Sequence, residues 1–316
     1  MSAHLPRRRV AWRQRGLLGL VAVAGLSVTL PAQTFRSGVD AVMVDVLVTR
    51  GGRPVDGLSA DDFTVTDNGV RQRIETVLLE DAPITLLLVL DISGSVGGSG
   101  LDRLRAAALA AGDALGPDDR VGLVTFSDTV HLAVAPPAPP DQLPLAVGRV
   151  RAGGATALYD ATFAALTLRE QIGQRTVMLV FSDGNDSVSW LDPRDVLDTA
   201  QRSDMVVYAV TLDRDRRVTL MNRQHRDLTR QWFPVEPELF RRAYLSWLVE
   251  DTGGSVFAGY DVDRLPDAFA RVVSEFRTRY VLVYSPTGVD AGGWHDLDVR
   301  VRGRGRRVQA RRGYRR

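Results

Sequence analysis

Residues 84–95 have the sequence I-T-L-L-L-V-L-D-I-S-G-S, and this stretch decides the fold class. The run from Ile84 to Leu90 is continuously apolar, which is typical of a parallel strand covered on both faces. A second run of this kind lies at Thr176–Phe181. Alanine- and leucine-rich segments alternate with these and further short apolar runs. The alternation predicts an α/β domain with a doubly wound, mostly parallel sheet.

Short β-rich segments precede and follow this domain. Upstream, the patterns predict a strand at Ala41–Thr49 and a hairpin between Phe63–Thr66 and Ile74–Leu79, with Asp67-Asn68-Gly69 as its turn. Downstream, strands are predicted at Tyr280–Tyr284, Leu297–Val301 and Val308–Ala310. We therefore expect an N-terminal β module at 39–80, the α/β domain at 84–285, and a C-terminal β segment at 286–316 that pairs with the N-terminal module as a small β-sandwich-like unit. Within the α/β domain, the proline-rich Ala135–Pro140 is expected to be a loop.

Residues 1–32 have the pattern of an export signal. Five arginines precede the apolar stretch Gly16–Leu30, and Ala32 offers a cleavage point. The apolar stretch is shorter than the roughly 20 residues that span a bilayer, which favours a cleaved signal peptide. An uncleaved N-terminal anchor is the alternative. The sequence predicts an exported protein that is periplasmic, cell-surface or secreted.

Composition excludes several classes of protein. The chain has no cysteine, which excludes disulfides, thiolate metal sites and a cysteine nucleophile. Without residues 1–32 and the arginine-rich 300–316, the remaining body has 26 basic and 38 acidic residues, a net charge of −12. Nucleic-acid partners are not expected, because such proteins usually carry a basic patch on the folded body. Membrane contact is expected only through an uncleaved signal.

Two aspartates follow the two apolar runs. Asp91 comes directly after Leu90, and Asp183 follows Phe181 after one serine. In open α/β sheets, ligands bind beyond the carboxyl ends of the strands, so we expect both aspartates at one sheet edge. Three hydroxyl side chains are expected to join them, namely Ser93, Ser95 and Thr156. Such an all-oxygen set suits a hard cation, with Mg²⁺ expected and Mn²⁺ or Ca²⁺ as alternatives.

The motifs resemble a known family. D-I-S-G-S at 91–95, G-G-A-T-A-L-Y-D-A at 153–161 and F-S-D-G-N-D at 181–186 resemble the three segments of a metal-ion-dependent adhesion site in von Willebrand factor type A domains. F-R-S-G-V-D (35–40), G-L-S-A-D-D-F-T-V-T-D-N-G (57–69) and A-R-R-G-Y (310–314) resemble the bacterial VWFA-related family of exported proteins. The resemblance implies Ser93, Ser95 and Thr156 as direct metal ligands, with Asp91 and Asp183 acting mainly through water. One departure is Arg214–Pro237, which is longer than this domain needs.

The resemblance implies a non-enzymatic protein that binds a carboxylate of a protein or surface ligand through the metal. An envelope or secretion assembly factor that docks through the same domain is an alternative. A serine hydrolase or phosphatase is less favoured, because G-x-S-x-G is absent around the serines and no histidine has the context of a general base. Each piece alone also fits a simpler role: a turn for the serine loop, for Asp183 and for Asp186, and a helix cap for Thr156.

Overall fold

The computed structural model describes residues 41–79, 82–211, 237–258 and 261–316. The predicted export signal at 1–32, and all but the last residue of the connection 214–237, lie outside these ranges. Every described residue belongs to a single unit that spans Val39–Arg316. Within the described ranges, no helix is both long and apolar enough to cross a bilayer.

The central sheet has six strands in the order β11-β10-β9-β6-β7-β8. Neighbouring strands are parallel except for β7 and β8, which are antiparallel. Strand β6 lies inside the sheet and all of its residues are buried, as its apolar run predicted. The strands are β6 (Ile84–Asp91), β7 (Arg120–Phe126), β8 (Val130–Ala138), β9 (Arg175–Phe181), β10 (Val206–Thr211) and β11 (Val256–Ala258).

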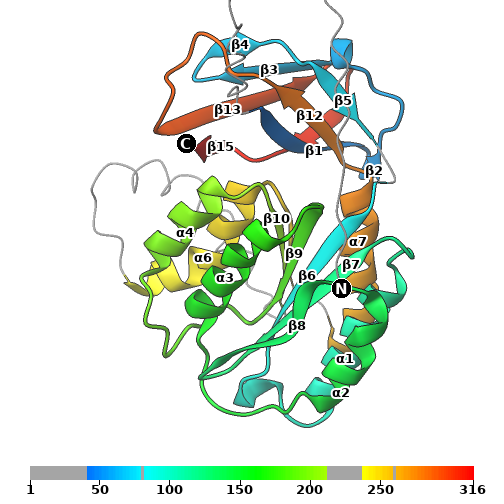
Figure 1. Cartoon of the computed structure of the whole chain (residues 1–316), viewed down its shortest axis with the longest axis vertical. Coiled ribbons are helices and arrows are strands. Elements are labelled where there is room, and N and C mark those ends of the chain that lie inside the picture. Colours follow the sequence, from blue (N-terminus) through cyan, green and yellow to red (C-terminus); the bar gives the residue numbers. More distant parts are fainter. Residues whose placement is uncertain (1–40, 80–81, 212–236, 259–260) are drawn as a thin grey trace, which may run out of the picture. The chain divides into compact units, whose positions relative to one another are not determined.

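Helices cover both faces of this sheet (Figure 1). Alternate residues of β6 point to opposite sides, so that Leu86 and Leu88 enter one apolar cluster while Leu87 and Val89 enter another. The first cluster contains residues of α1 (Ser99–Asp113), α2 (Leu143–Arg149) and α7 (Leu265–Arg277). The second contains residues of α3 (Leu158–Thr167), α4 (Pro193–Arg202) and α6 (Pro237–Thr252). The predicted doubly wound α/β fold is therefore confirmed.

The proline-rich stretch 135–140 is not the loop that the sequence predicted. Strand β8 continues through Pro136 and Pro137 to Ala138, and a short 3₁₀ helix, Pro140–Gln142, then leads into α2. Proline is tolerated here because β8 is the last strand of the sheet, and an edge strand leaves one row of N–H groups without a ladder partner. Helix α2 was missed because its proline stands in the first turn, where no N–H is needed.

The remaining strands form two further sheets. One has the order β14-β1-β12-β5, with β2 paired to β1, and the other has the order β15-β13-β3-β4. Strands from before and after the α/β region pair in both, because β1 pairs with β12 and β14 while β3 pairs with β13. Buried residues of both sheets form one apolar cluster. The strands are β1 (Val42–Arg50), β2 (Arg53–Pro54), β3 (Phe63–Asp67), β4 (Val70–Gln72), β5 (Thr76–Leu78), β12 (Tyr280–Tyr284), β13 (Trp294–Val301), β14 (Arg306–Gln309) and β15 (Gly313–Arg315).

The hairpin after Phe63 has a different second strand from the one predicted. Strand β3 pairs with β4, beginning at Asp67 opposite Val70, and β5 pairs with β12 in the other sheet. Asn68 and Gly69 have φ values of +46° and +80°, as the tight two-residue hairpin turn requires. Because this turn reverses the chain within two residues, residues 70–72 form the second strand of the hairpin, which the prediction had assigned to 74–79.

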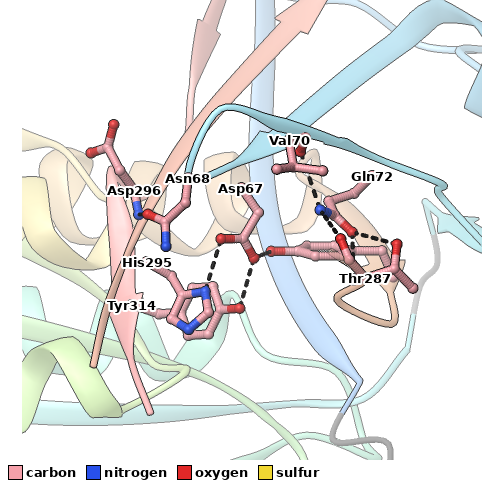
Figure 2. A network of polar contacts seen from close by, with 9 residues as sticks. Asp67, Asn68, Val70, Gln72, Thr287, His295, Asp296 and Tyr314 are labelled. Atoms are coloured by element: carbon pink, nitrogen blue, oxygen red, sulfur yellow. Dashed lines mark hydrogen bonds and ion pairs between the residues drawn. The ribbon is translucent and has the colours of Figure 1, made fainter. Parts of the chain in front are cut away.

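A buried polar network joins the two sheets (Figure 2). Asp67 of β3 and His295 of β13 are fully buried, and His295 Nδ1 lies 2.8 Å from Asp67 Oδ1. The hydroxyls of Tyr284 and Tyr314 donate to Asp67 Oδ2 at 2.9 and 2.8 Å. Burial, followed by the contact with Asp67, raises the pKa of Tyr314 to about 12, so its hydroxyl keeps the proton that it donates. One carboxylate thus links β3 with β12, β13 and β15.

Candidate metal centre

The two predicted aspartates lie at the same edge of the central sheet. Asp91 is the last residue of β6, and Asp183 follows the end of β9 after Ser182. Strands β6 and β9 are adjacent and parallel, with Leu90 opposite Phe181. Because the carboxyl ends of parallel neighbours meet at one edge, the loops after both strands lie together.

Asp91 is a buried carboxylate held by neutral donors. Only 1% of its surface is exposed. The Ser93 N–H donates to Oδ1 at 2.9 Å, and the Ser182 hydroxyl donates to Oδ2 at 2.8 Å. Burial raises the pKa of Asp91, while these hydrogen bonds lower it and the nearby charge of Asp183 raises it further. The two carboxylates therefore repel each other, and a bound cation would relieve that repulsion.

The two serines of the D-I-S-G-S loop point to a common place. Ser93 Oγ and Ser95 Oγ lie 3.2 Å apart. Ser93 is buried and Ser95 is exposed, so the pair extends from the protein interior to the surface. Ser93 precedes the short 3₁₀ helix Gly94–Val96, but its side chain does not cap that helix. Both hydroxyl oxygens thus remain available as acceptors for a cation.

Backbone hydrogen bonds join the loop that contains Thr156 to the serine loop. The Gly94 N–H donates to the Gly154 carbonyl at 3.0 Å, and the Gly153 N–H donates to the Ile92 carbonyl at 2.8 Å. The third loop is attached in turn, because the Thr156 N–H donates to Ser187 Oγ at 3.0 Å. The three motif segments, which are far apart in the sequence, therefore form one loop cluster.

Thr156 does not cap the following helix, so the simpler role considered for it is wrong. The residue at the cap position of α3 is Ala157, and no side chain at that position accepts a hydrogen bond. The N–H groups of Leu158 and Tyr159 donate instead to Asp186 Oδ1, at 2.8 and 3.3 Å. Asp186 is thus a helix-capping residue from the third loop, and the Thr156 side chain is left for another role.

A cavity of about 600 Å³ opens beside these loops. Asp91, Ser95 and Asp183 line it, so the structure brings three of the five predicted residues to one hollow. Ser93 lies beside this cavity through its contact with Ser95. Thr156 is connected to the cavity only through the backbone hydrogen bonds of its loop. The other lining residues are Val96, Gly97, Ser99, Gly100, Arg103, Phe181, Asn185 and Leu265.

The chemistry of these donors suits a hard cation. Among the described residues, no group of three or more His, Cys, Asp or Glu side chains is placed to hold a metal. The candidate site differs from such groups because it has only two carboxylates and takes its other side-chain oxygens from hydroxyl groups. Asp91, Asp183 and Ser95 line the cavity, and Ser93 Oγ lies 3.2 Å from Ser95 Oγ. These side chains form an all-oxygen set of the kind that Mg²⁺ accepts together with water. The residues present therefore fit the cation that the sequence predicted.

Sequence reasoning missed Ser182, which positions Asp91. Its hydroxyl donates to Asp91 and accepts from the Gly184 N–H at 3.1 Å. The only signal in the sequence is its place directly before Asp183. Successive side chains of an extended segment point in opposite directions, so the neighbour of an exposed aspartate is expected to point inward.

The fold and this loop cluster define the class of the domain: a doubly wound α/β domain with an oxygen-rich site at the carboxyl edge of its sheet. Residues 85–226 match the family model of the von Willebrand factor type A domain. The chain therefore carries a domain of the von Willebrand factor type A family, as its three loop motifs predicted. No curated protein matches the chain.

Several solved structures resemble this chain. A von Willebrand factor type A protein from Catenulispora acidiphila is 12% identical, with a TM-score of 0.49 over 86% of this chain and 72% of that chain. An aerotolerance-related membrane protein from Bacteroides fragilis NCTC 9343 is 12% identical, with a TM-score of 0.45 over 61% of this chain and 99% of that chain. The von Willebrand factor domain of the type V pili tip protein Mfa5 from Porphyromonas gingivalis is 10% identical, with a TM-score of 0.43 over 61% and 94%. Similarity at this level carries no information on ligand or partner.

Proposed function

We propose that this chain is an exported, non-enzymatic binding protein that takes an acidic group of a protein or surface ligand at a metal-ion-dependent adhesion site. Ser93, Ser95 and Thr156 would hold Mg²⁺ directly, and Asp91 and Asp183 would act mainly through water. When bound, the cation supplies an electrophilic coordination position for a carboxylate. Mn²⁺ or Ca²⁺ would occupy the same oxygen set.

One observation carries this proposal: the buried Asp91 carboxylate lies where three loops meet. Its hydrogen-bond donors are neutral, and Asp183 adds a second negative charge nearby. A buried carboxylate beside another carboxylate is costly without a compensating cation. The adjacent serine hydroxyls supply oxygens with no charge of their own, so a bound cation would keep much of its attraction for an outside carboxylate.

The proposal leaves out catalysis because, among the described residues, no histidine forms a hydrogen bond with the site serines. Ser93 and Ser95 lie against each other, and the Ser93 N–H donates to Asp91. The described histidines have partners elsewhere: His131 contacts Thr129, and His295 contacts Asp67. A serine nucleophile needs a base within hydrogen-bonding distance.

We propose export because residues 1–32 combine a basic segment with a short apolar stretch. We also propose that the two further sheets form one β-sandwich-like module, built from the predicted segments 39–80 and 286–316 together with β12, which pairs with β1 and β5 although the sequence assigned it to the α/β domain. Its support is the pairing of β3 with β13 and the apolar cluster that the two sheets share. The von Willebrand factor A-type domain, predicted at 84–285, would then be inserted into this module and would end after α7, before β12.

The central test is a metal titration of the chain without residues 1–32. Isothermal calorimetry with Mg²⁺, Mn²⁺ and Ca²⁺ should show one saturable site, and Asp91→Ala should abolish it while the circular dichroism spectrum is unchanged. Asp298→Ala is the matched control, because Asp298 is an exposed aspartate of β13 paired with Arg300. Equal metal uptake by Asp91→Ala and the unmodified chain, or no uptake by either, would refute the proposal.

Ser182→Ala should weaken metal binding without removing a proposed ligand. The substitution deletes the 2.8 Å hydrogen bond that orients Asp91, and changes of this kind in outer-shell partners lower affinity by about 10- to 100-fold. Calorimetry with Mg²⁺ measures the change. Ser203→Ala is the control, because the Ser203 hydroxyl also accepts a local backbone N–H, from Met205, but precedes β10 at the opposite sheet edge. A Ser182→Ala affinity within twofold of the unmodified chain would show that Asp91 needs no such positioning.

A further inference from the structure

An exposed tryptophan stands on the third loop of the candidate metal centre. Trp190 is 95% exposed, the largest exposed fraction among the exposed large hydrophobic side chains of the described residues. Val188, two residues earlier, is 42% exposed. The next residue, Leu191, turns the other way and packs against the apolar cluster that contains α3 and α4. The loop thus buries one apolar side chain and presents two others to solvent.

The backbone that carries Trp190 is held firmly. Asp160, in the first turn of α3, accepts the N–H of Trp190 at 3.0 Å and the N–H of Leu191 at 3.0 Å. Ser189 Oγ accepts the N–H groups of Tyr159 and Asp160 at 3.1 and 3.2 Å. These contacts fasten the loop to the start of a helix on both sides of the tryptophan. Because this backbone is already ordered, a partner that covers Trp190 does not have to order the loop as well.

The same loop borders the proposed metal ligands. It begins at Asp183, and the N–H groups of Ser187 and Val188 donate to the Thr156 carbonyl at 2.9 and 3.2 Å. Val188 is therefore in direct contact with a residue of the candidate site. A partner whose carboxylate reached that site would therefore lie next to this loop.

We propose that Trp190 and Val188 form the apolar half of a two-part binding surface, whose occupant is a segment of a partner protein with one carboxylate beside an aromatic or branched aliphatic side chain. The carboxylate half rests on the proposed function. The rest of that segment is neutral or basic, because the loops and the helix start that border this surface supply the carboxylates of Asp160, Asp183 and Asp186, which repel further acidic groups. Tryptophan, with tyrosine and arginine, is enriched among the residues that contribute most to binding at protein interfaces.

The test selects random linear peptides displayed on phage against the immobilised chain in Mg²⁺, with elution by chelator. Selected peptides should share a carboxylate with an aromatic or branched aliphatic residue close to it. For the best synthetic peptide, Trp190→Ala should raise the Kd about 30-fold, as expected of a dominant interface tryptophan, and Trp190→Phe should raise it only a few-fold. Leu145→Ala is the matched control, because Leu145 is 63% exposed on α2, against the opposite face of the sheet, and its loss should change nothing.

Mg²⁺ titration of each variant separates the two proposals. Trp190→Ala should bind Mg²⁺ as the unmodified chain does. If the unmodified chain takes up no metal, the proposed function fails. The inference fails and the metal site stands if the unmodified chain takes up metal but selects no peptides, or selects peptides with carboxylates and no apolar neighbour. It also fails if Trp190→Ala binds the selected peptide as tightly as the unmodified chain does. Trp190-dependent binding to phosphatidylcholine–phosphatidylglycerol vesicles, or Trp190-dependent self-association in sedimentation, would also overturn it by assigning the loop another occupant.

Discussion

Asp67→Ala should lower the free energy of unfolding by about 3–5 kcal/mol, because it removes the one carboxylate that satisfies three buried donors. The Tyr314 hydroxyl and Nδ1 of His295 contact Asp67 (Figure 2), and so does the Tyr284 hydroxyl. His295 Nε2 is already buried without a hydrogen-bond partner among the described residues, so the ring has no second hydrogen bond to replace the one to Asp67. Buried donors that lose their acceptor keep the full cost of leaving water.

Urea unfolding followed by circular dichroism measures this change. Tyr314→Phe should have a smaller effect of about 1–2 kcal/mol, because it removes one hydrogen bond and leaves Asp67 with two partners. Tyr314→Phe also keeps the prediction testable if Asp67→Ala does not fold. Asp298→Ala should change stability by less than about 1 kcal/mol, because its pairing with Arg300 is exposed to solvent. If Asp67→Ala also changes the free energy of unfolding by less than about 1 kcal/mol, the network does not hold the two sheets together.

Gly254→Ala should lower the free energy of unfolding by about 3 kcal/mol, at the upper end of the effects of overpacking. A Cβ at this position would lie 1.8 Å from the Val207 carbonyl oxygen and 2.7 Å from its carbon. Both atoms belong to the backbone of β10, which is hydrogen-bonded on both sides, to β9 and to β11. The strand therefore has no free direction in which to move away from the new methyl group.

Thermal and urea unfolding of this variant should be compared with those of Gly173→Ala. Gly173 has open space around the position of a Cβ and no positive φ, so alanine should change stability there by no more than about 0.5 kcal/mol. If Gly254→Ala and Gly173→Ala both unfold at the same temperature and urea concentration as the unmodified chain, the close approach of Gly254 to Val207 is wrong.

The architecture of the central domain could be predicted because its signals are local. A strand buried on both faces has a continuous apolar run, and Ile84–Leu90 shows one without interruption. Asp192 caps helix α4 by accepting the Arg194 N–H, and the helix begins at Pro193. Such starting signals lie within a few residues of one another. Prediction failed at 135–149, where prolines in an edge strand and in a first helical turn resemble those of a loop.

The candidate site could be predicted only in part. That Asp91 and Asp183 would meet followed from their positions after two parallel strands. That Ser182 would contact Asp91, and that Asp186 would cap α3, did not follow from any pattern. These contacts depend on how three loops pack, and loop packing is decided by residues that are distant in sequence.

The stretch Asp67-Asn68-Gly69 has one feature that the sequence determines and another that depends on the tertiary structure. The sequence by itself determined that the chain turns here, because Asn and Gly accept the positive φ values of a tight hairpin. Only the tertiary structure decided that Asp67 would be the centre of a buried network, since its partners Tyr284, His295 and Tyr314 are 217, 228 and 247 residues away. Backbone preference acts between neighbouring residues, whereas the burial and partners of a charge depend on which strands the whole fold brings together.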